Sequence, residues 1–337
     1  MHEPSVALIG PGQVGTALQQ QIAEAGWDLK YTVRRSGIFN EHGELVEPRL
    51  ERIPDTALPY VDLVFNCTPS TSAEYGYINY YTGLSTPVVS SAKWTLSCEF
   101  DAVRDRLHLI GPDAMVGGGT GMLDWIRDRM RGRRDVVMHG VLNGTMCFIL
   151  DQMDREKLSL GQAVERARVL HYAEPGATSP LEVIVGEIKD TSYKSGIVSN
   201  LCLELPVSMC AEKIEKFRPF GQDQLDHVVS EAHDRRYIVS FLPEGARDEP
   251  DIIGGFEYQL SNGMRISAGF KNVRRNPLLT NLVLQNANNA VLTLEGPNGR
   301  NGVYMGPSGP GAGRNETAGA MMANARKLRK NLHNRRR

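Results

Sequence analysis

A glycine-rich turn near the start of the chain joins an apolar run to a segment with helical periodicity, in "VALIGPGQVGTAL". Gly10 follows the apolar run, and Gly12 and Gly15 lie where the helical pattern begins. Gly10 permits a tight turn, Gly12 leaves the backbone open to a close neighbour, and Gly15 allows the helix to pack closely on the strand. The chain is therefore expected to begin with a strand, a tight turn and a helix that covers a sheet.

The first 135 residues repeat this alternation of short apolar runs and helix-like segments. The apolar runs are "SVALIG", "LKYTVRR", "VDLVFNCTPS" and "TPVVSSAK". Near-continuous apolar strands separated by helical periodicity are typical of a parallel sheet with helices on both faces. Residues 1–135 are predicted to form a Rossmann-type doubly wound α/β domain.

The pattern changes after residue 135. Longer helical segments such as "SLGQAVERARVLHYA" are followed by strand-like runs between Arg236 and Thr293, including "RYIVSFL" and "MRISAGF". This mixture predicts a second, α+β domain over 136–305 with a mostly antiparallel sheet. A glycine-rich turn and a helix over 306–330 could return to the first domain, and 331–337 form a basic tail that we interpret as a solvated helix end.

Composition narrows the class of partner. The 38 lysines and arginines nearly balance the 39 acids, so the net charge of −1 favours neither nucleic acid nor an acidic membrane surface. The five cysteines form no CxxC pair and have no metal-ligand spacing. No apolar run approaches the roughly 20 residues that span a bilayer, and the N-terminus has no signal-peptide pattern. We expect a cytoplasmic protein with reduced thiols and a small-molecule partner.

The glycine turn also has the spacing of a dinucleotide-binding fingerprint. Gln13 and Val14 begin the helix, whose free N–H groups would face a pyrophosphate that approaches Gly12. The alternative is a glycine turn without a ligand, but the strand-turn-helix setting favours the nucleotide.

The end of the second apolar run bears on the choice of cofactor. Enzymes that use NAD(H) place an acid there for the ribose 2′-hydroxyl, whereas this chain has Arg34 and Arg35. A guanidinium suits a 2′-phosphate, so NADP(H) is preferred to NAD(H), unless both arginines merely face solvent. Thr68 follows the next apolar run and is expected at the ligand-binding edge of the sheet.

Seven further segments occur in an order and spacing that resembles homoserine dehydrogenases. They are "SSAKWTLS", "DAMVGGGTGML", "VLNGTMCFIL", "HYAEP", "DTSYKSGIV", "NPLLTNLVLQNANNAV" and "GPGAGRNETA". The resemblance runs from Val6 to about Leu328. It implies a homodimeric enzyme of amino-acid biosynthesis, on the route to threonine and methionine, that interconverts L-aspartate 4-semialdehyde and L-homoserine with a nicotinamide cofactor. We expect neither the aspartokinase nor the ACT domain that some relatives carry.

The resemblance also assigns roles to individual positions. It implies that Lys194 is the catalytic lysine, that Lys93 lies near the nicotinamide, and that Asp190 accompanies Lys194. The substrate-binding residues it implies are Tyr172, Glu174, Asn143, Gly144 and Thr145, with Glu174 holding the substrate's amino group. Gly311 and Gly313 match glycines that close over the cofactor. A sodium site built from backbone carbonyls would fall on Asp113, Val116, Gly118 and Thr120.

Elementary chemistry supports the catalytic role of Lys194. An ammonium near a carbonyl oxygen stabilises developing negative charge and then donates its proton to the alkoxide. On a helix, Asp190 and Lys194 would share one face at i, i+4 spacing, with the acid nearer the N-terminus. Taken alone, the pair reads more readily as a surface salt bridge, Lys93 as a loop lysine and Glu174 as an exposed acid. Asn143 and Thr145 could equally cap the following helix.

The segment between residues 176 and 189 departs most from the family pattern. It lacks an Asp-Pro pair and is longer than usual, and its Glu182, Glu187 and Lys189 have no counterparts in the family, so we interpret them as surface residues. Three hypotheses follow. The chain is a homoserine dehydrogenase, a relative recruited to another amino-acid semialdehyde or alcohol or to a lyase step, or a non-catalytic NADPH-binding sensor. Retention of Lys93, Glu174, Asp190 and Lys194 argues against the sensor.

Overall fold

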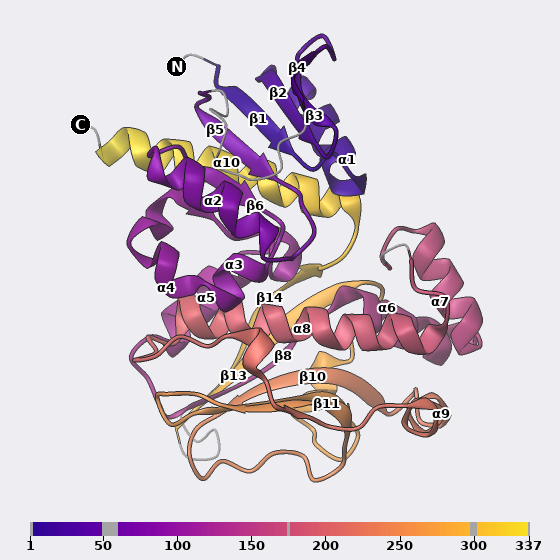
Figure 1. The fold of residues 1–337 in the computed structure, drawn as a ribbon. Coiled ribbons are helices and arrows are strands. Elements are labelled where there is room, and N and C mark those ends of the chain that lie inside the picture. The colour runs from indigo at the N-terminus through magenta and orange to yellow at the C-terminus, as the bar shows by residue number, and fades with distance from the viewer. Residues whose placement is uncertain (1–2, 49–59, 174–175, 297–301, 336–337) are drawn as a thin grey trace. The chain divides into compact units, whose positions relative to one another are not determined.

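The computed structural model describes residues 3–48, 60–173, 176–296 and 302–335 (Figure 1). Two compact units are formed. The first contains residues 1–115 together with 314–337, and the second contains residues 116–313.

Sheet A of the first unit has seven strands within the described residues, in the order β4-β3-β2-β1-β5-β6-β7. Strands β2, β1, β5, β6 and β7 are parallel, which confirms the predicted Rossmann-type sheet. Strands β3 and β4 extend this sheet as antiparallel hairpins. The strands are β1 (Ser5–Ile9), β2 (Asp28–Arg34), β3 (Gly37–Asn40), β4 (Leu45–Pro48), β5 (Leu63–Asn66), β6 (Val88–Ser90) and β7 (Ile110–Gly111).

Buried apolar side chains of α1 and α10 pack on sheet A. Leu18 and Ile22 of α1 pack on Val6 and Leu8 of β1 in one core, and Met321 of the C-terminal helix α10 joins the same core. Figure 1 shows α10, in yellow, running beside the strands of this unit. The helices are α1 (Gln13–Glu24), α2 (Ala73–Gly83), α3 (Trp94–Cys98), α4 (Phe100–Val103), η1 (Arg104–Leu109) and α10 (Arg314–Arg335).

Sheet B of the second unit is antiparallel between each pair of described neighbours, in the order β14-β13-β8-β10-β12-β11-β9. All eight residues of β10 are buried, because β10 lies at the centre of the sheet. The strands are β8 (Val136–Val141), β9 (Lys216–Phe217), β10 (Arg235–Leu242), β11 (Ile252–Gln259), β12 (Arg265–Asn272), β13 (Asn288–Glu295) and β14 (Gly302–Pro310). The predicted α+β class of this unit is confirmed.

Helices α5 and α6 pack on sheet B in the second unit, and α8 packs against both of them. The helical elements are η2 (Gly117–Gly119), α5 (Met122–Met130), α6 (Gly144–Arg155), α7 (Leu160–Val169), α8 (Pro180–Cys202), η3 (Ala211–Lys213), α9 (Gln222–Ser230) and η4 (Leu279–Leu282). The limits of the compact units differ from those predicted at residues 135 and 305. The second unit begins earlier because α5 packs against α8, and it ends later because β14 pairs with β13.

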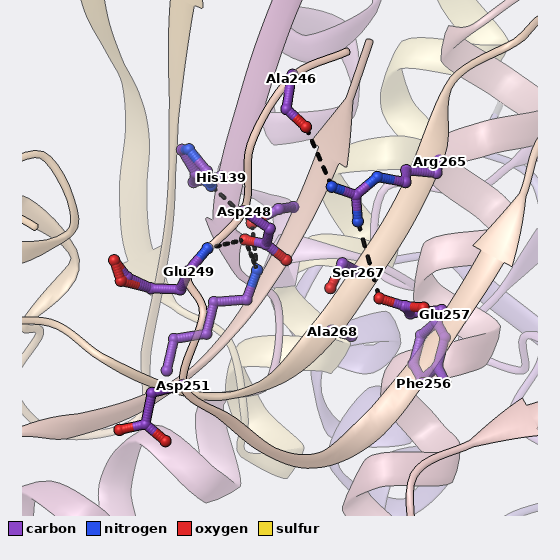
Figure 2. A network of polar contacts seen from close by, with 12 residues as sticks. His139, Ala246, Asp248, Glu249, Asp251, Phe256, Glu257, Arg265, Ser267 and Ala268 are labelled. Carbon is purple, nitrogen blue, oxygen red and sulfur yellow. Dashed lines mark hydrogen bonds and ion pairs between the residues drawn. The ribbon is translucent and has the colours of Figure 1, made fainter. Parts of the chain in front are cut away.

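A polar network is buried in sheet B (Figure 2). The Lys271 ammonium, which is 0% exposed, lies 2.6 Å from the Asp248 carboxylate and donates to Ser240 Oγ at 2.7 Å. Ser240 Oγ lies 2.6 Å from His139 Nδ1. The network therefore connects β8, β10 and β12 to the chain that follows β10.

Acid should destabilise the protein through His139. Burial and the nearby Lys271 charge lower the pKa of His139 from 6.5 to about 3. Below pH 6.5 the His139 imidazole therefore binds a proton in the unfolded chain but stays neutral in the folded protein. Its contribution to the free energy of unfolding is complete only above pH 6.5. The loss should reach about 3 kcal/mol by pH 4. Urea unfolding of the native protein and of His139→Gln at pH 7.5 and pH 4 measures it, and the variant should lose less stability. If the native protein and His139→Gln lose the same free energy of unfolding between pH 7.5 and pH 4, His139 is not the group responsible.

Two sequence expectations concern the thiols and the membrane. None of the five cysteines, all of them among the described residues, forms a disulfide, and burial raises the pKa of Cys67, Cys147 and Cys202 to about 12, so these thiols stay protonated. None of the helices described has the length and apolar character needed to cross a bilayer.

Candidate active site

The glycine turn has the geometry that its spacing predicts. Gly10 has φ +77°, and a side chain there would lie 2.9 Å from the Cys67 carbonyl oxygen. A side chain at Gly15 would lie 2.7 Å from the Gly10 carbonyl oxygen, whereas nothing lies within 4 Å of the corresponding position at Gly12. Among the residues that the structure describes, no side chain caps the first turn of α1. The turn is tight where the chain must bend and open where a phosphate would approach the free N–H groups.

Arg34 and Arg35 lie at the carboxyl end of β2, where the chain turns into β3. Both side chains are exposed, and the Arg34 guanidinium lies 5.1 Å from the centre of the Phe39 ring. The β2–β3 hairpin thus presents two cations at the edge of sheet A that binds ligands in folds of this class.

Polar side chains connect the carboxyl ends of β5 and β6. Thr68 Oγ1 donates to Asn66 Oδ1 at 2.9 Å, and Asn66 Nδ2 donates to Ser90 Oγ at 3.1 Å. Lys93 follows β6 directly, and its backbone N–H donates to Ser70 Oγ at 3.0 Å. The structure therefore brings Thr68 and Lys93, both singled out in the sequence, to the same edge of sheet A.

Helix α8 begins within the segment that departs from the family pattern. Ser179 Oγ accepts from the Glu182 N–H, the Glu182 carboxylate accepts from the Ser179 N–H, and Pro180 occupies the first helical position. Hydrogen bonds from the N–H and hydroxyl of Thr178 and from the N–H of Ser179 hold the pKa of Glu182 below its usual range. A single helix therefore runs from Pro180 through Asp190 and Lys194, two of the three predicted catalytic residues.

Asp190 and Lys194 form an ion pair on α8. Lys194 Nζ lies 2.8 Å from Asp190 Oδ2, and the two side chains are 9% and 27% exposed. The expected i, i+4 geometry is present, but the lysine is far more buried than in a surface salt bridge. Burial strengthens the pair because water competes less for both charges.

Asn143 connects this ion pair to the start of α6. Its side-chain oxygen accepts from the Met146 N–H at 2.8 Å, so Asn143 caps the helix. Its Nδ2 donates to Glu187 Oε2 at 2.6 Å and lies 3.4 Å from Asp190 Oδ2. The interpretation of Glu187 as a surface residue is corrected here, because its carboxylate is half-buried and lies on the same helix face as Asp190.

The remaining residues of this turn are held close to neighbouring backbone. Thr145 Oγ1 donates to the Tyr172 carbonyl oxygen at 2.6 Å, and the Tyr172 ring lies 5.0 Å from that of Phe148. A side chain at Gly144 would lie 2.6 Å from the Ala287 carbonyl oxygen, which also accepts from the Gly311 N–H at 2.8 Å. Only glycine fits at residue 144, so the turn can lie against the chain around Gly311.

The other predicted positions are less closely associated. Gly313 has φ +117° and ends the second unit. Asp113 lies in the first unit, where its carboxylate accepts from Asn324 Nδ2 at 2.9 Å. Val116, Gly118 and Thr120 lie at the start of the second unit, and Glu174 lies outside the described residues.

Comparison with known proteins identifies the family. The model of the family described as homoserine dehydrogenase matches residues 122–325, more than half of the chain. The chain belongs to the homoserine dehydrogenase family. The family comprises NAD(P)-dependent oxidoreductases that act on CH–OH groups.

Individual relatives agree with this membership. A homoserine dehydrogenase of Lactococcus lactis is 23% identical over 222 residues, a match that covers 60% of this chain and 51% of the relative's length. The solved homoserine dehydrogenase of Thermoplasma acidophilum has a TM-score of 0.68 at 17% identity, over 98% of this chain and all of that one. A hyperthermophilic archaeal homoserine dehydrogenase in complex with NADPH has a TM-score of 0.63 at 18% identity, covering 98% of both chains. The solved structures share the fold.

Proposed function

We propose that this chain is an NADP-dependent homoserine dehydrogenase, which interconverts L-aspartate 4-semialdehyde and L-homoserine. The observation that carries the proposal is the buried Lys194–Asp190 pair beside Asn143, in a chain of this family. A buried ammonium held by a carboxylate is what the reduction of an aldehyde requires from the protein.

The glycine turn and its surroundings fit a dinucleotide. The free N–H groups at the start of α1 and the open approach at Gly12 would hold the pyrophosphate, and Gln13 and Val14 begin that helix. Bound NADPH supplies the hydride. Thr68, Lys93, Gly311 and Gly313 are our further proposals for cofactor contacts. The solved relative in complex with NADPH supports this choice of cofactor.

Arg34 and Arg35 should give the preference for NADP(H). The variant with both arginines changed to alanine should bind NADPH about 10- to 100-fold more weakly, because each charge-assisted hydrogen bond to a 2′-phosphate is lost. Its affinity for NADH should change much less. Fluorescence titration measures both affinities. Lys30→Ala removes a cation from the same strand that already pairs with Asp28 and Glu41, and should leave both affinities unchanged. Equal losses for the two cofactors would overturn the 2′-phosphate assignment.

The residues around Lys194 suit the binding of the aldehyde and the transfer of a proton to its oxygen. The Lys194 ammonium would polarise the aldehyde oxygen and donate a proton to the alkoxide, while Asp190 keeps it charged and oriented. Asn143, Gly144, Thr145 and Tyr172 would line the substrate, and Glu174 would hold its amino group. Glu187 adds a second carboxylate beside Asp190, and we include it among the groups that recognise the amino-acid substrate.

Two finer proposals concern a sodium ion and the assembly. Carbonyl groups of Val116, Gly118 and Thr120, all in the second unit, would bind sodium. Within the described residues the buried Thr120 Oγ1 has no hydrogen-bond partner, so it offers an oxygen to a hard cation. We also propose a homodimer, for which sedimentation equilibrium should give twice the mass of one chain.

The second candidate function is dehydrogenation of another amino alcohol. Glu187 favours it, because this carboxylate comes from the segment that departs from the family pattern. Purified protein with NADP⁺ should be assayed with L-homoserine beside a panel of amino alcohols of different length. Turnover of homoserine above the panel supports the first proposal, and turnover of a panel member alone supports the second. No turnover of any compound, with NADPH still bound, would favour a sensor.

A further inference from the structure

A buried carboxylate contacts the first turn of α3, the helix that follows Lys93, in the first unit. Glu74, in the first turn of α2, is 0% exposed. Its Oε1 accepts from the Thr95 N–H at 2.8 Å, and its Oε2 has no hydrogen-bond partner within the described residues. Burying a carboxyl oxygen without a hydrogen-bond partner lowers the stability of the fold. Packing alone therefore does not explain a glutamate at residue 74.

The Thr95 contact links Glu74 to the backbone that carries Lys93. Lys93 is the residue before α3, and Thr95 lies in the first turn of that helix. No side chain within α3 or at its N-cap accepts a hydrogen bond from the N–H groups of this turn. The Glu74 carboxylate, on α2, accepts one from the Thr95 N–H instead. Ser70 holds the Lys93 N–H, and Ser97 Oγ donates to the Lys93 carbonyl oxygen at 2.8 Å. The backbone of Lys93 is thus fixed on both sides.

Charge gives Glu74 a second effect on Lys93. Burial raises the pKa of Glu74 to about 7, although the hydrogen bond from Thr95 and the charge of Lys93 act in the opposite direction. Strands β5 and β6, which pack on α2, contain no titratable side chain, and α3 contributes Cys98 at its far end. Helix α2 itself carries Tyr75, Tyr77, Tyr80 and Tyr81, and burial raises the pKa of Tyr77 and Tyr81 above 10. The charge of Lys93 favours the ionised form of Glu74.

We infer that Glu74 is a positioning residue for Lys93, fixing the start of α3 and attracting the Lys93 ammonium when its own carboxyl is ionised. The inference rests on the proposed function in giving Lys93 a place beside the nicotinamide. Protonation of Glu74 removes the attraction but keeps the Thr95 hydrogen bond. The orientation of Lys93, and with it the rate of hydride transfer, should then depend on pH around neutrality.

The kinetic test uses Glu74→Gln, which keeps the shape and the acceptor for Thr95 but removes the charge. Its kcat should fall about 10- to 100-fold above pH 7, because a misplaced catalytic group costs this much, while KM for the substrate stays within about twofold. The pH profile of kcat should lose the step near pH 7. Glu99→Gln removes an exposed acid at the other end of α3 and should leave both unchanged. An unchanged pH profile in Glu74→Gln would overturn the inference.

A second measurement does not depend on turnover. Lysines reductively methylated with ¹³C give separate NMR signals, and Lys93→Arg identifies the signal of Lys93. This signal should shift between pH 6 and pH 8 in the native sequence and stay constant in Glu74→Gln. If no amino alcohol is turned over but the Lys93 signal still shifts, the proposed function fails and the coupling stands. If the Lys93 signal does not change with pH, or shifts equally in the native protein and in Glu74→Gln, Glu74 and Lys93 are not coupled.

Discussion

Lys194→Ala should lower kcat by about 10³- to 10⁴-fold, the contribution expected from a general acid that also stabilises the developing oxyanion. Alanine removes the ammonium that polarises the aldehyde oxygen, and the buried site offers water little access to replace the proton. The affinity for NADPH should stay nearly unchanged, because Lys194 is not among the groups proposed to bind the cofactor. Steady-state kinetics and a fluorescence titration with NADPH measure the two effects.

Lys189→Ala is the matched control for that experiment. Lys189 lies on the same helix but is exposed, and its ammonium lies 5.9 Å from the centre of the Tyr193 ring rather than beside Asp190. This variant should retain turnover. If Lys194→Ala keeps more than about a tenth of the native kcat, another group is the proton donor. If it also loses NADPH binding, the substitution has disturbed the fold.

Lys271→Met should lower the free energy of unfolding by about 3–5 kcal/mol, the largest stability effect we expect from a single substitution. Methionine keeps the length of the side chain but leaves the Asp248 carboxylate buried without its counter-ion. Burial alone would raise the pKa of Asp248, and in the native protein the charge and hydrogen bond of Lys271 hold it below its usual range. Urea unfolding at pH 7 measures the loss.

Two outcomes distinguish a buried ion pair from simple packing. The double variant Lys271→Met with Asp248→Leu should be more stable than Lys271→Met alone, because no uncompensated charge remains. The defect of Lys271→Met should also shrink as the pH falls, since the unpaired Asp248 can then take up a proton. A loss below about 1 kcal/mol, or no recovery in the double variant, would contradict this role of the pair.

Much of the fold follows from periodicity in the sequence. Strands β1, β2, β5 and β6 of sheet A and strands β10, β12 and β13 of sheet B are apolar runs long enough to be recognised, whereas β7 has only two residues. Other strands lack that signal. Strand β14 is rich in glycine and proline, and its residues alternate between half-buried and exposed because it lies at the edge of the sheet. Its pairing with β13 depends on contacts that local sequence does not encode.

The candidate site was predictable where local rules apply. The i, i+4 spacing of Asp190 and Lys194 predicts their contact on a helix, and the glycine spacing predicts the turn before α1. Glu187 was missed, although the capping box of Ser179 and Glu182 announces a helix from Pro180. A helix starting there would have placed Glu187 on the face of Asp190. The resemblance to homoserine dehydrogenases assigns no role to Glu187, because this segment departs from the family pattern.

Glu74 and the buried network of sheet B lay beyond sequence reasoning for a different reason. Glu74 acts on α3 from another helix, and Lys271, Ser240 and His139 come from three strands that are adjacent in space but distant in sequence. Their burial and pKa values arise only after the chain has packed. Such couplings are readable from the structure and not from residue spacing.

The transfer of a labelled hydride tests the central proposal most directly. L-Homoserine deuterated at its carbinol carbon should be incubated with the purified protein and NADP⁺, and the NADPH formed should be examined by mass spectrometry. We predict NADPH that carries one deuterium on the nicotinamide ring, and none formed by Lys194→Ala under the same conditions. NADPH without deuterium, or no NADPH from L-homoserine while the protein still binds the cofactor, would contradict the assignment of this chain as a homoserine dehydrogenase.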